Sequence, residues 1–255
     1  MNAESARATS SNDVILGNQS RIVSNLYINL LSMLNEKSVA AIVAAYNEEQ
    51  TIGPIVATLV ASKLFRDVIV ISDGSTDKTA EIAKQSGATL VHQFPWKHGK
   101  GSAMLHGVAH TDAPILFFLD ADLKGLAVEH LTKILEPVRT GRLSMCVGIR
   151  DRGWFGMKLA AHLPLIGGER AMSRSVFENI PDVYLQGFMV EGALNYYCRS
   201  NDLPYGTVEL SGLKIRRKMQ KVGVWKGLNE YVKMWIQVVR AMIIVRIARH
   251  RGKFV

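Results

Sequence analysis

Short apolar runs alternate with longer, more polar segments from Val39 to Ile149, and this alternation constrains the fold more than any other feature of the chain. The apolar runs are too short for anything but buried strands, whereas the segments between them have the length of helices. Strands that alternate with such helices predict an α/β fold, in which helices cover both faces of a mostly parallel sheet. The expected strands are residues 39–45, 67–72, 88–92, 114–120 and 143–149, and the expected helices begin near Thr51, Asp77, Lys100 and Ala127.

Signals at the ends of the expected helices agree with this interpretation. Asn47 and Gln50 stand where the N-cap and N3 residues of the first helix are expected, and Pro54 falls in its first turn. Gly87 follows the last turn of the second expected helix, where glycine commonly ends a helix.

The two ends of the chain differ in character from this central part. Residues 1–18 are polar and irregular, and residues 19–36 carry apolar residues at helical spacing. After about residue 150 the alternation stops, and a segment rich in Gly, Trp, Phe and Arg begins. In an α/β enzyme this is where an acceptor-binding subregion would be inserted. We expect a helix around 187–200, a short strand near 205–210 and a long helix over about 225–250.

Composition favours one main globular domain. The chain has 255 residues, 48% of them apolar and 21% charged, which is enough to bury one substantial core. Cys146 and Cys198 lie far apart without metal-ligand spacing, so they suggest neither a disulfide framework nor a zinc site but buried thiols. The first residues lack the order of a signal peptide, and no run approaches the ~18 apolar residues of a membrane span. We therefore expect a cytoplasmic protein.

Positive charge is concentrated at the C-terminal end. From Lys214 onward there are twelve Lys or Arg and a single acid, Glu230, so this segment carries +11. Because the net charge of the chain is +9, the other 213 residues carry −2. A basic segment on a nearly neutral body predicts a local anionic partner, such as lipid headgroups, phosphates or nucleic acid.

Two acids end the expected strand over 114–120. Asp120 and Asp122 are one residue apart at what should be the carboxyl edge of the sheet, where ligands of α/β proteins bind. Two carboxylates there make an oxygen-rich site that suits Mg²⁺ or Mn²⁺ carrying a diphosphate. An isolated Asp-x-Asp is more often a solvated turn, so the interpretation depends on the motifs that precede it.

Those motifs also stand at strand ends and helix starts. The first strand ends in AAYNEEQTI and lacks the Gly-x-Gly-x-x-Gly of a Rossmann dinucleotide site. Asp73 ends the second strand in SDGSTD, where its carboxylate can face the N–H of a base; alternatively, Ser75, Thr76 and Asp77 simply cap a helix. Lys100 lies in HGKGS, which is not a Walker loop but offers backbone N–H groups and one ammonium to an anion.

Taken in order, AAYNEEQTI, VISDGSTDKT, HGKGSAM and FLDADL resemble the nucleotide-binding half of the family 2 glycosyltransferases of the GT-A fold. The resemblance covers residues 39–150 closely, and one position departs from it, since Ala45 stands where many relatives carry Pro. It implies a GT-A (Rossmann-like) sheet, an inverting sugar transfer and a nucleotide-diphosphate-sugar donor, with Mg²⁺ or Mn²⁺ as cofactor. The implied donor-site residues are Ala45, Tyr46 and Glu48 at base and ribose, Asp73 on the base, Lys100 beside them, and Asp120 and Asp122 at ribose and metal.

The second half carries looser similarity. GERAMSR, at residues 168–174, and GFMVE, at 187–191, resemble acceptor-side motifs of the polyprenyl-phosphate sugar transferases and the glucosyl-3-phosphoglycerate synthases. This resemblance implies that Glu191 is a catalytic carboxylate alongside Asp122; alternatively, Glu191 is a first-turn helix glutamate. Arg170 and Arg174 suit an acceptor phosphate, because guanidinium binds phosphate in a fork.

The nature of the acceptor decides what Glu191 has to do. A sugar hydroxyl must lose a proton to a base, whereas a phosphate monoester is already mostly dianionic at pH 7 and needs none.

By resemblance to the polyprenyl-phosphate transferases, Arg216, Arg217 and Lys218 would lie over the donor diphosphate. The basic, aromatic helix after them suits either an anionic membrane surface or docking on the core.

Three hypotheses follow for the function. The first is a metal-dependent inverting glycosyltransferase that moves a sugar from a UDP- or GDP-sugar to a polyprenyl phosphate or another cell-envelope acceptor, as a peripheral protein on the inner face of the membrane. The second keeps the donor but uses a soluble phosphorylated acceptor such as 3-phosphoglycerate. The third is a non-catalytic nucleic-acid-binding protein; it leaves the acidic motifs unexplained, and we expect no nucleic-acid partner.

We divide the chain into an N-terminal tail and helix (1–37), a GT-A domain (38–212) and a basic C-terminal segment (213–255).

Overall fold

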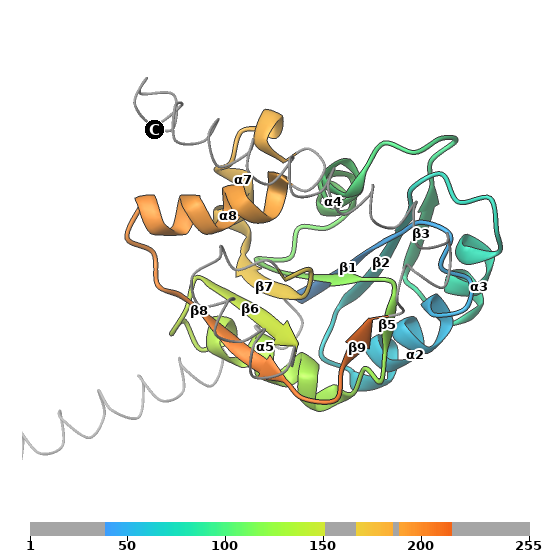
Figure 1. Cartoon of the computed structure of the whole chain (residues 1–255), viewed down its shortest axis with the longest axis horizontal. Helices are drawn as coiled ribbons and strands as arrows, with labels where there is room; N and C mark the ends of the chain where they lie inside the picture. The colour runs from blue at the N-terminus through green and yellow to red at the C-terminus, as the bar shows by residue number, and fades with distance from the viewer. Residues whose placement is uncertain (1–38, 151–166, 186–188, 216–255) are drawn as a thin grey trace, which may run out of the picture.

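The structure of the protein is a computed structural model that describes residues 39–150, 167–185 and 189–215. Within these residues the main sheet has seven strands, in the order β3-β2-β1-β4-β7-β6-β8 (Figure 1). Its strands are β1 (Val39–Ala45), β2 (Asp67–Ser72), β3 (Leu90–Gln93), β4 (Ile115–Asp120), β6 (Met145–Arg150), β7 (Arg170–Ser173) and β8 (Tyr205–Leu210). A second, two-stranded sheet pairs β5 (Leu123–Lys124) with β9 (Lys214–Ile215).

The main sheet is parallel except at β7. Strands β3, β2, β1 and β4 pair in parallel, as do β6 and β8. Strand β7 lies between β4 and β6 and pairs antiparallel with both, so those two neighbours point the same way. The expectation of a mostly parallel α/β sheet is confirmed.

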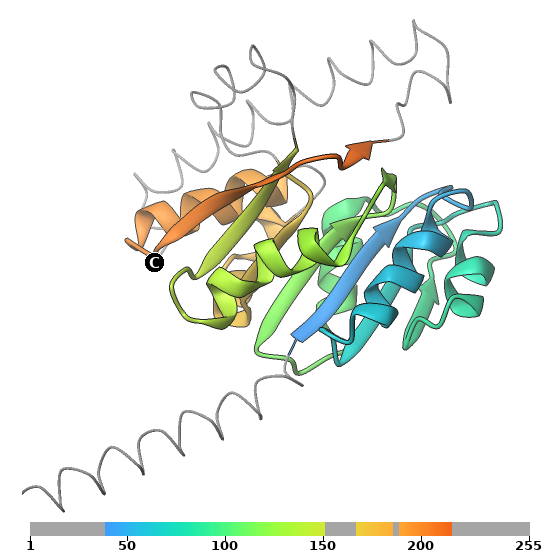
Figure 2. The same ribbon diagram turned by 90° about the horizontal axis from the view of Figure 1, so that it is seen from below.

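Helices cover both faces of this sheet, as Figure 1 shows. One face packs against α2 (Ile52–Ser62), α3 (Thr79–Gln85) and α5 (Val128–Arg139), which lie in front of the strands in Figure 2. The other face packs against α4 (Lys100–Val108), α7 (Arg174–Glu178) and α8 (Met189–Ser200), and a short 3₁₀ helix, η1 (Asp182–Tyr184), precedes α8. The central strands are therefore buried on both sides.

Strand β1 shows how the sequence produces these two cores. Successive side chains of a strand point to opposite faces, so Val39, Ala41 and Val43 enter the core beneath α2 and α5, and Ile42 enters the core beneath α4. All four are at most 1% exposed. Burial on both faces explains why β1 is apolar throughout instead of alternating with polar residues.

All of the strands and helices expected between residues 39 and 150 are present, with ends that shift by at most two residues. The N-cap prediction was wrong: Thr51 occupies that position, while Asn47 lies further back, in the left-handed region with φ 54°. Gly87 follows α3 with φ 94°, as expected of a residue that ends a helix. Cys146 and Cys198 are buried free thiols.

The helices expected over 19–36 and 225–250 fall outside the described residues. Among the helices that are described, none is both long and apolar enough to cross a bilayer.

Candidate active site

The carboxyl ends of β1, β2 and β4 lie side by side. Ala45 pairs with Ser72 of β2, and Ala44 pairs with Asp120 of β4, so the motifs at these three strand ends meet at one edge of the sheet. The chain proceeds outward from β1 to β2 and β3 and then returns to place β4 on the other flank of β1. Such a reversal of strand order is where open α/β sheets bind their ligands.

Lys100 connects Asp120 at the end of β4 with Glu191 of α8 (Met189–Ser200). It is the first residue of α4, and its ammonium nitrogen lies 2.7 Å from Asp120 Oδ1 and 2.7 Å from Glu191 Oε1. Glu191 comes from the first turn of α8, 91 residues further along the chain, and its side chain is 7% exposed. Burial opposes the charge on Lys100, but Asp120 and Glu191 together raise the pKa of its ammonium above the ordinary value. Lys100 is therefore a permanent cation between two acids.

Asp120 stays ionised in this setting. Its burial favours the neutral acid, yet Lys100, and beyond it Arg150 and Arg170, lower the pKa of the carboxyl below its usual range. Asp120 therefore presents a carboxylate at neutral pH, as a metal ligand must.

Arg170, in β7, lies on the other side of Glu191. It is 1% exposed, its guanidinium lies 3.9 Å from Glu191 Oε2, and it donates two hydrogen bonds to the carbonyl of Gly167. The register sets Arg170 opposite Phe118, two residues before Asp120, so the structure brings it into the predicted site.

Glu169 and Arg150 also belong to this cluster, although neither is among the predicted site residues. Glu169 is fully buried with Arg150 at 3.3 Å, and among the described residues neither of its carboxylate oxygens accepts a hydrogen bond. Burial, and then the charge of Asp120, raise the pKa of Glu169 to about 7. Arg150 is the last residue of β6, and Glu169 directly precedes β7. Glu169 belongs to the motif GERAMSR, in which only the two arginines were predicted as site residues.

The residues around Asp120 fit a divalent metal. Asp122 follows β4 by two residues and is half-buried, so the strand end carries two acidic residues, Asp120 and Asp122. Gly168 packs directly on Asp120, because a Cβ added there would lie 1.9 Å from Asp120 Oδ2. Oxygen donors of this kind suit Mg²⁺ or Mn²⁺ rather than a softer ion.

Asp73 fixes the turn that leads into α4. Its two oxygens accept hydrogen bonds from the backbone N–H groups of His98, at 2.6 Å, and Gly99, at 2.8 Å. Its own N–H donates to the carbonyl of Ala45, at 2.8 Å. These bonds join the ends of β1 and β2 to the HGKGS turn; that Asp73 also binds a base stays a prediction.

The loop after β1 is fastened to the loop after β2. The backbone N–H of Glu48 donates to Thr79 Oγ1, at 2.8 Å. Asp77 accepts a hydrogen bond from the N–H of Thr79, the first residue of α3, at 3.0 Å, while Lys78 is the N-cap residue of that helix. Tyr46 is 40% exposed, with the ammonium of Lys97 3.9 Å from its ring centroid. Tyr46 is thus an exposed aromatic residue whose ring contacts a cation.

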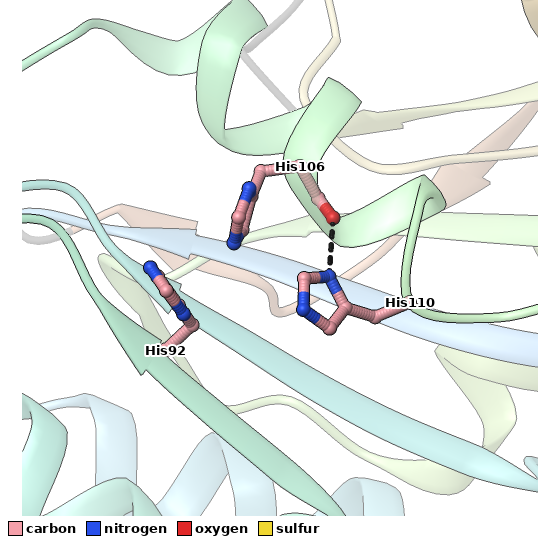
Figure 3. Close-up of side chains that lie close together, drawn as sticks. All are labelled: His92, His106 and His110. Atoms are coloured by element: carbon pink, nitrogen blue, oxygen red, sulfur yellow. Dashed lines mark hydrogen bonds between the residues drawn. The ribbon is translucent and has the colours of Figure 1, made fainter.

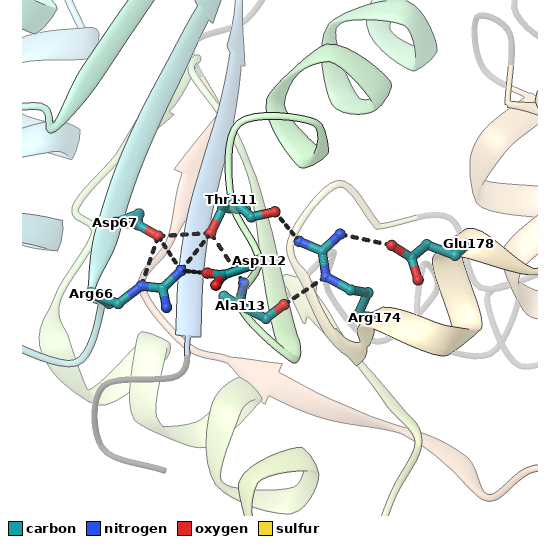
Figure 4. A network of polar contacts seen from close by, with 7 residues as sticks. All are labelled: Arg66, Asp67, Thr111, Asp112, Ala113, Arg174 and Glu178. Carbon is teal, nitrogen blue, oxygen red and sulfur yellow. Dashed lines mark hydrogen bonds and ion pairs between the residues drawn. The ribbon is translucent and has the colours of Figure 1, made fainter. Parts of the chain in front are cut away.

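Arg174 does not join the site. Its backbone N–H donates to Pro114, at the opposite end of β4 from Asp120. Its guanidinium bonds to the carbonyls of Ala113 and Thr111 and pairs with Glu178, as Figure 4 shows. The structure thus separates Arg170 from Arg174, although both were predicted as acceptor ligands. Arg216, Arg217 and Lys218 lie outside the described residues.

Comparison with known proteins agrees with this geometry. A family model described as Glycosyl transferase family 2 matches residues 40–191. The chain is 40% identical over 105 residues to a 4,4'-diaponeurosporenoate glycosyltransferase of Staphylococcus aureus strain bovine RF122 / ET3-1, and 39% identical to that of strain USA300. Each match covers 38% of this chain and 28% of the relative, so the chain matches little more than a quarter of the length of these proteins.

Solved structures match over a larger part of the chain. The chain is similar to glucosyl-3-phosphoglycerate synthase from Mycobacterium tuberculosis in complex with Mn²⁺, uridine diphosphate and glucosyl-3-phosphoglycerate, with a TM-score of 0.68 and 25% sequence identity. The alignment covers 82% of this chain and 80% of that one. The same synthase in complex with phosphoglyceric acid gives a TM-score of 0.66, also at 25% identity.

Proposed function

The chain belongs to glycosyl transferase family 2, and on that premise we propose that it transfers a sugar from a UDP-sugar to a phosphorylated acceptor, with Mg²⁺ or Mn²⁺ as cofactor. One observation carries the proposal. Asp120 and Asp122 stand at the reversal of strand order, and Lys100, Arg170 and Glu191 converge on the same edge from α4, β7 and α8. This arrangement offers carboxylates to a metal and cations to phosphates.

On the donor side, Asp120 and Asp122 would hold the metal. When bound there, the metal neutralises charge that develops on the leaving diphosphate. Asp73 and the segment Ala45–Glu48 border the same edge and are our candidates for the base and ribose contacts. Solved relatives crystallised with uridine diphosphate and Mn²⁺ support UDP over GDP as the donor nucleotide.

Glu191 acts as a positioning residue in this proposal. One of its oxygens faces Lys100 at 2.7 Å and the other faces Arg170 at 3.9 Å, so the carboxylate is engaged by two cations. A base must be able to turn to the proton that it removes. A carboxylate held in this way is better suited to fixing Lys100 and Arg170 for phosphate binding. An acceptor whose phosphate oxygen attacks the sugar requires no base, whereas an acceptor that attacks through a hydroxyl does.

Two kinds of acceptor remain candidates, each with its own support. A polyprenyl phosphate or another lipid phosphate is favoured by the +11 segment from Lys214 onward, since each basic group near an anionic membrane contributes about 1 kcal/mol. A soluble acceptor such as 3-phosphoglycerate is favoured by the solved relatives, whose complexes contain phosphoglyceric acid. Both present the same phosphate monoester to Arg170 and Lys100.

Calorimetry with UDP-, GDP-, ADP- and CMP-sugars tests the donor site. We expect one nucleotide to bind with Mn²⁺ and to lose affinity in EDTA and in Asp122→Asn. Asp202→Asn is the matched control, because Asp202 is exposed and Asn tolerates its φ of 51°. Equal binding by wild type and Asp122→Asn would contradict the metal assignment.

Transfer assays then separate the two acceptors. Radiolabelled sugar from the identified donor is offered with polyprenyl phosphate in anionic liposomes or with 3-phosphoglycerate in solution, and the liposomes are sedimented. Label in the lipid together with cosedimentation of the protein would support the lipid acceptor. Label on phosphoglycerate without cosedimentation would support the soluble one, and transfer to neither would reject the phosphorylated acceptor.

A further inference from the structure

Three histidines gather at the outer edge of the sheet, in a cluster separate from the acidic site. His92 comes from β3, His106 from α4, and His110 follows α4 by two residues. Each offers a ring nitrogen, and the three nitrogens lie within 4.8 Å of one another (Figure 3). We propose that His92, His106 and His110 bind one divalent transition-metal ion, with Zn²⁺ as the best fit, through three imidazole nitrogens.

The hydrogen bonds of the cluster leave nitrogen lone pairs available for a metal. His110 Nδ1 lies 2.8 Å from the carbonyl oxygen of His106, and since a carbonyl only accepts, Nδ1 must carry the hydrogen. Nε2 of His110 is then the nitrogen with a free lone pair. Metal-binding histidines commonly show this pattern, in which the second ring nitrogen donates to a carbonyl and fixes the tautomer.

His106 supplies the second independent observation. Its Nε2 is buried, and among the described residues it makes no hydrogen bond. Buried polar atoms nearly always have a partner, so an unpaired nitrogen that faces two other imidazoles needs an explanation. A metal ion shared by the three rings provides one.

Ring packing holds the imidazoles in place. His106 lies 4.2 Å from His92 and 4.5 Å from His110 between ring centroids, and Phe94 packs against both His92 and His106. A tetrahedral ion with bonds of 2.0–2.1 Å needs ligand nitrogens about 3.4 Å apart, so the widest pair must close by at most about 1.4 Å. Rotation of the exposed side chain of His110 can supply much of that movement.

The donor set indicates which metals would bind. Three neutral imidazoles without a carboxylate suit Zn²⁺, Co²⁺, Ni²⁺ or Cu²⁺, whereas Mg²⁺ and Mn²⁺ prefer the oxygens of Asp120 and Asp122. Because His110 is exposed, water can fill the fourth position of a tetrahedral ion. Such an ion would join the edge strand β3 to α4, the helix whose first residue is Lys100.

Metal titration of the full chain, without a polyhistidine tag, tests this proposal. Titrations of Co²⁺ followed by visible absorption and of Zn²⁺ followed by calorimetry are made in the Asp122→Asn background, which weakens the acidic site. We expect one equivalent to bind, and His92→Ala, His106→Ala and His110→Ala each to weaken binding at least about 100-fold, more than the loss of an outer-shell partner does. His98→Ala, which removes a neighbouring exposed histidine outside the cluster, should bind like the background protein.

Thermal unfolding separates loss of a ligand from loss of the fold. Zn²⁺ should raise the unfolding midpoint of the background protein but not that of His110→Ala, whose midpoint without metal should be unchanged because the side chain is exposed. If His106→Ala does not fold, His110→Ala alone decides. The absence of a bound equivalent, or binding by His110→Ala equal to that of His98→Ala, would overturn the proposal, and neither result bears on the sugar donor site.

Discussion

Lys100 is the residue whose charge the candidate site depends on most. It lies between Asp120 and Glu191, and removal of its ammonium would leave two partly buried carboxylates facing each other. We expect Lys100→Met to lower the free energy of unfolding by about 1–3 kcal/mol, less than for a fully buried pair because Lys100 and Asp120 retain some exposure. The rate of sugar transfer should fall at least about 100-fold, because the ammonium that would stabilise negative charge on the phosphates is lost.

Urea unfolding and initial-rate assays check this prediction. Lys133→Met, on the exposed side of α5, is the matched control and should change neither quantity. The double variant Lys100→Met with Glu191→Gln should recover part of the lost stability, because it removes one of the two opposing charges. Unchanged stability of Lys100→Met would mean that the two ion pairs contribute nothing in solution.

Glu169 predicts a pH dependence of stability. In the folded protein the carboxyl of Glu169 has a pKa of about 7, against an ordinary value of 4.5. Between pH 4.5 and pH 7, folding is therefore accompanied by binding of a proton to Glu169. The stabilisation from this residue is complete below pH 4.5 and is lost as the pH rises to about 7. In Glu169→Gln, which cannot titrate, that loss should be absent.

The measurement is the difference in unfolding free energy between wild type and Glu169→Gln from pH 4 to 8. We expect wild type to lose stability relative to the variant between pH 4.5 and 7, with little further change above. Glu209→Gln, at an exposed position of β8, should give a difference that does not vary over that range. A constant difference for Glu169→Gln as well would show that Glu169 titrates normally.

At the scale of elements, Gly107 determines how closely α4 packs on β1. A Cβ built at Gly107 would lie 2.4 Å from Cγ2 of Ile42. Alanine favours a helix over glycine by about 1 kcal/mol, but overpacking a core typically costs 1–3 kcal/mol. We therefore expect Gly107→Ala to lower stability by about 1 kcal/mol, and Ile42→Ala to reduce that loss when combined with it.

Gly192 is the matched control, because it lies in α8 with nothing within 4 Å of an added Cβ. Gly192→Ala should stabilise the protein by about 0.5–1 kcal/mol in the same urea experiment. If Gly107→Ala also stabilised, the contact between α4 and β1 would have to be looser than the structure shows.

The elements of the first half could be predicted because each carries its own local signal. Strands such as β1 and β4 are continuous apolar runs, and Gly87 marks a helix end through its backbone conformation alone. Strand β7 gives no such signal: it has four residues, begins with the buried Arg170, and is antiparallel in a sheet of parallel strands. Its assignment requires knowledge of β4 and β6, its neighbours in space.

The site was predictable to the same extent. Asp73, Lys100, Asp120 and Asp122 stand at strand ends or helix starts, where the expected fold alone brings them to one edge. The contact of Lys100 with Glu191 joins residues 91 apart, and no spacing in the sequence encodes it. Glu169 was missed because its importance comes from its burial beside Asp120, which a single sequence does not reveal.

At the scale of the whole molecule, Arg174 fastens α7 to the end of the sheet opposite the site. It bonds to two carbonyls of the loop before β4, while Arg66 bonds to Asp67 and Thr111 beside it (Figure 4). We expect Arg174→Gln to lower the free energy of unfolding by about 1–3 kcal/mol, because the partly buried carbonyls of Ala113 and Thr111 lose their charged hydrogen-bond donor. The KM for either substrate should not change.

Urea unfolding together with sugar-transfer kinetics checks this separation of roles. Arg142→Gln, which alters an exposed arginine, should be neutral in both assays, and Arg170→Gln should impair transfer. A raised KM for the acceptor in Arg174→Gln, at unchanged stability, would return Arg174 to the acceptor site.

The position of β7 also has a genetic consequence. Strands β1 to β4 come from one uninterrupted stretch of chain, and β6, β7 and β8 come from the stretch that follows. A single crossover in the gene, within the codons for the turn at Gly125, would exchange the whole second stretch and preserve the first. The incoming stretch would have to supply one short antiparallel strand beside β4 and one carboxylate opposite Lys100. The topology thus allows recombination to replace α5, β6, β7 and β8 together, while the strand ends that carry Asp73 and Asp120 are inherited intact.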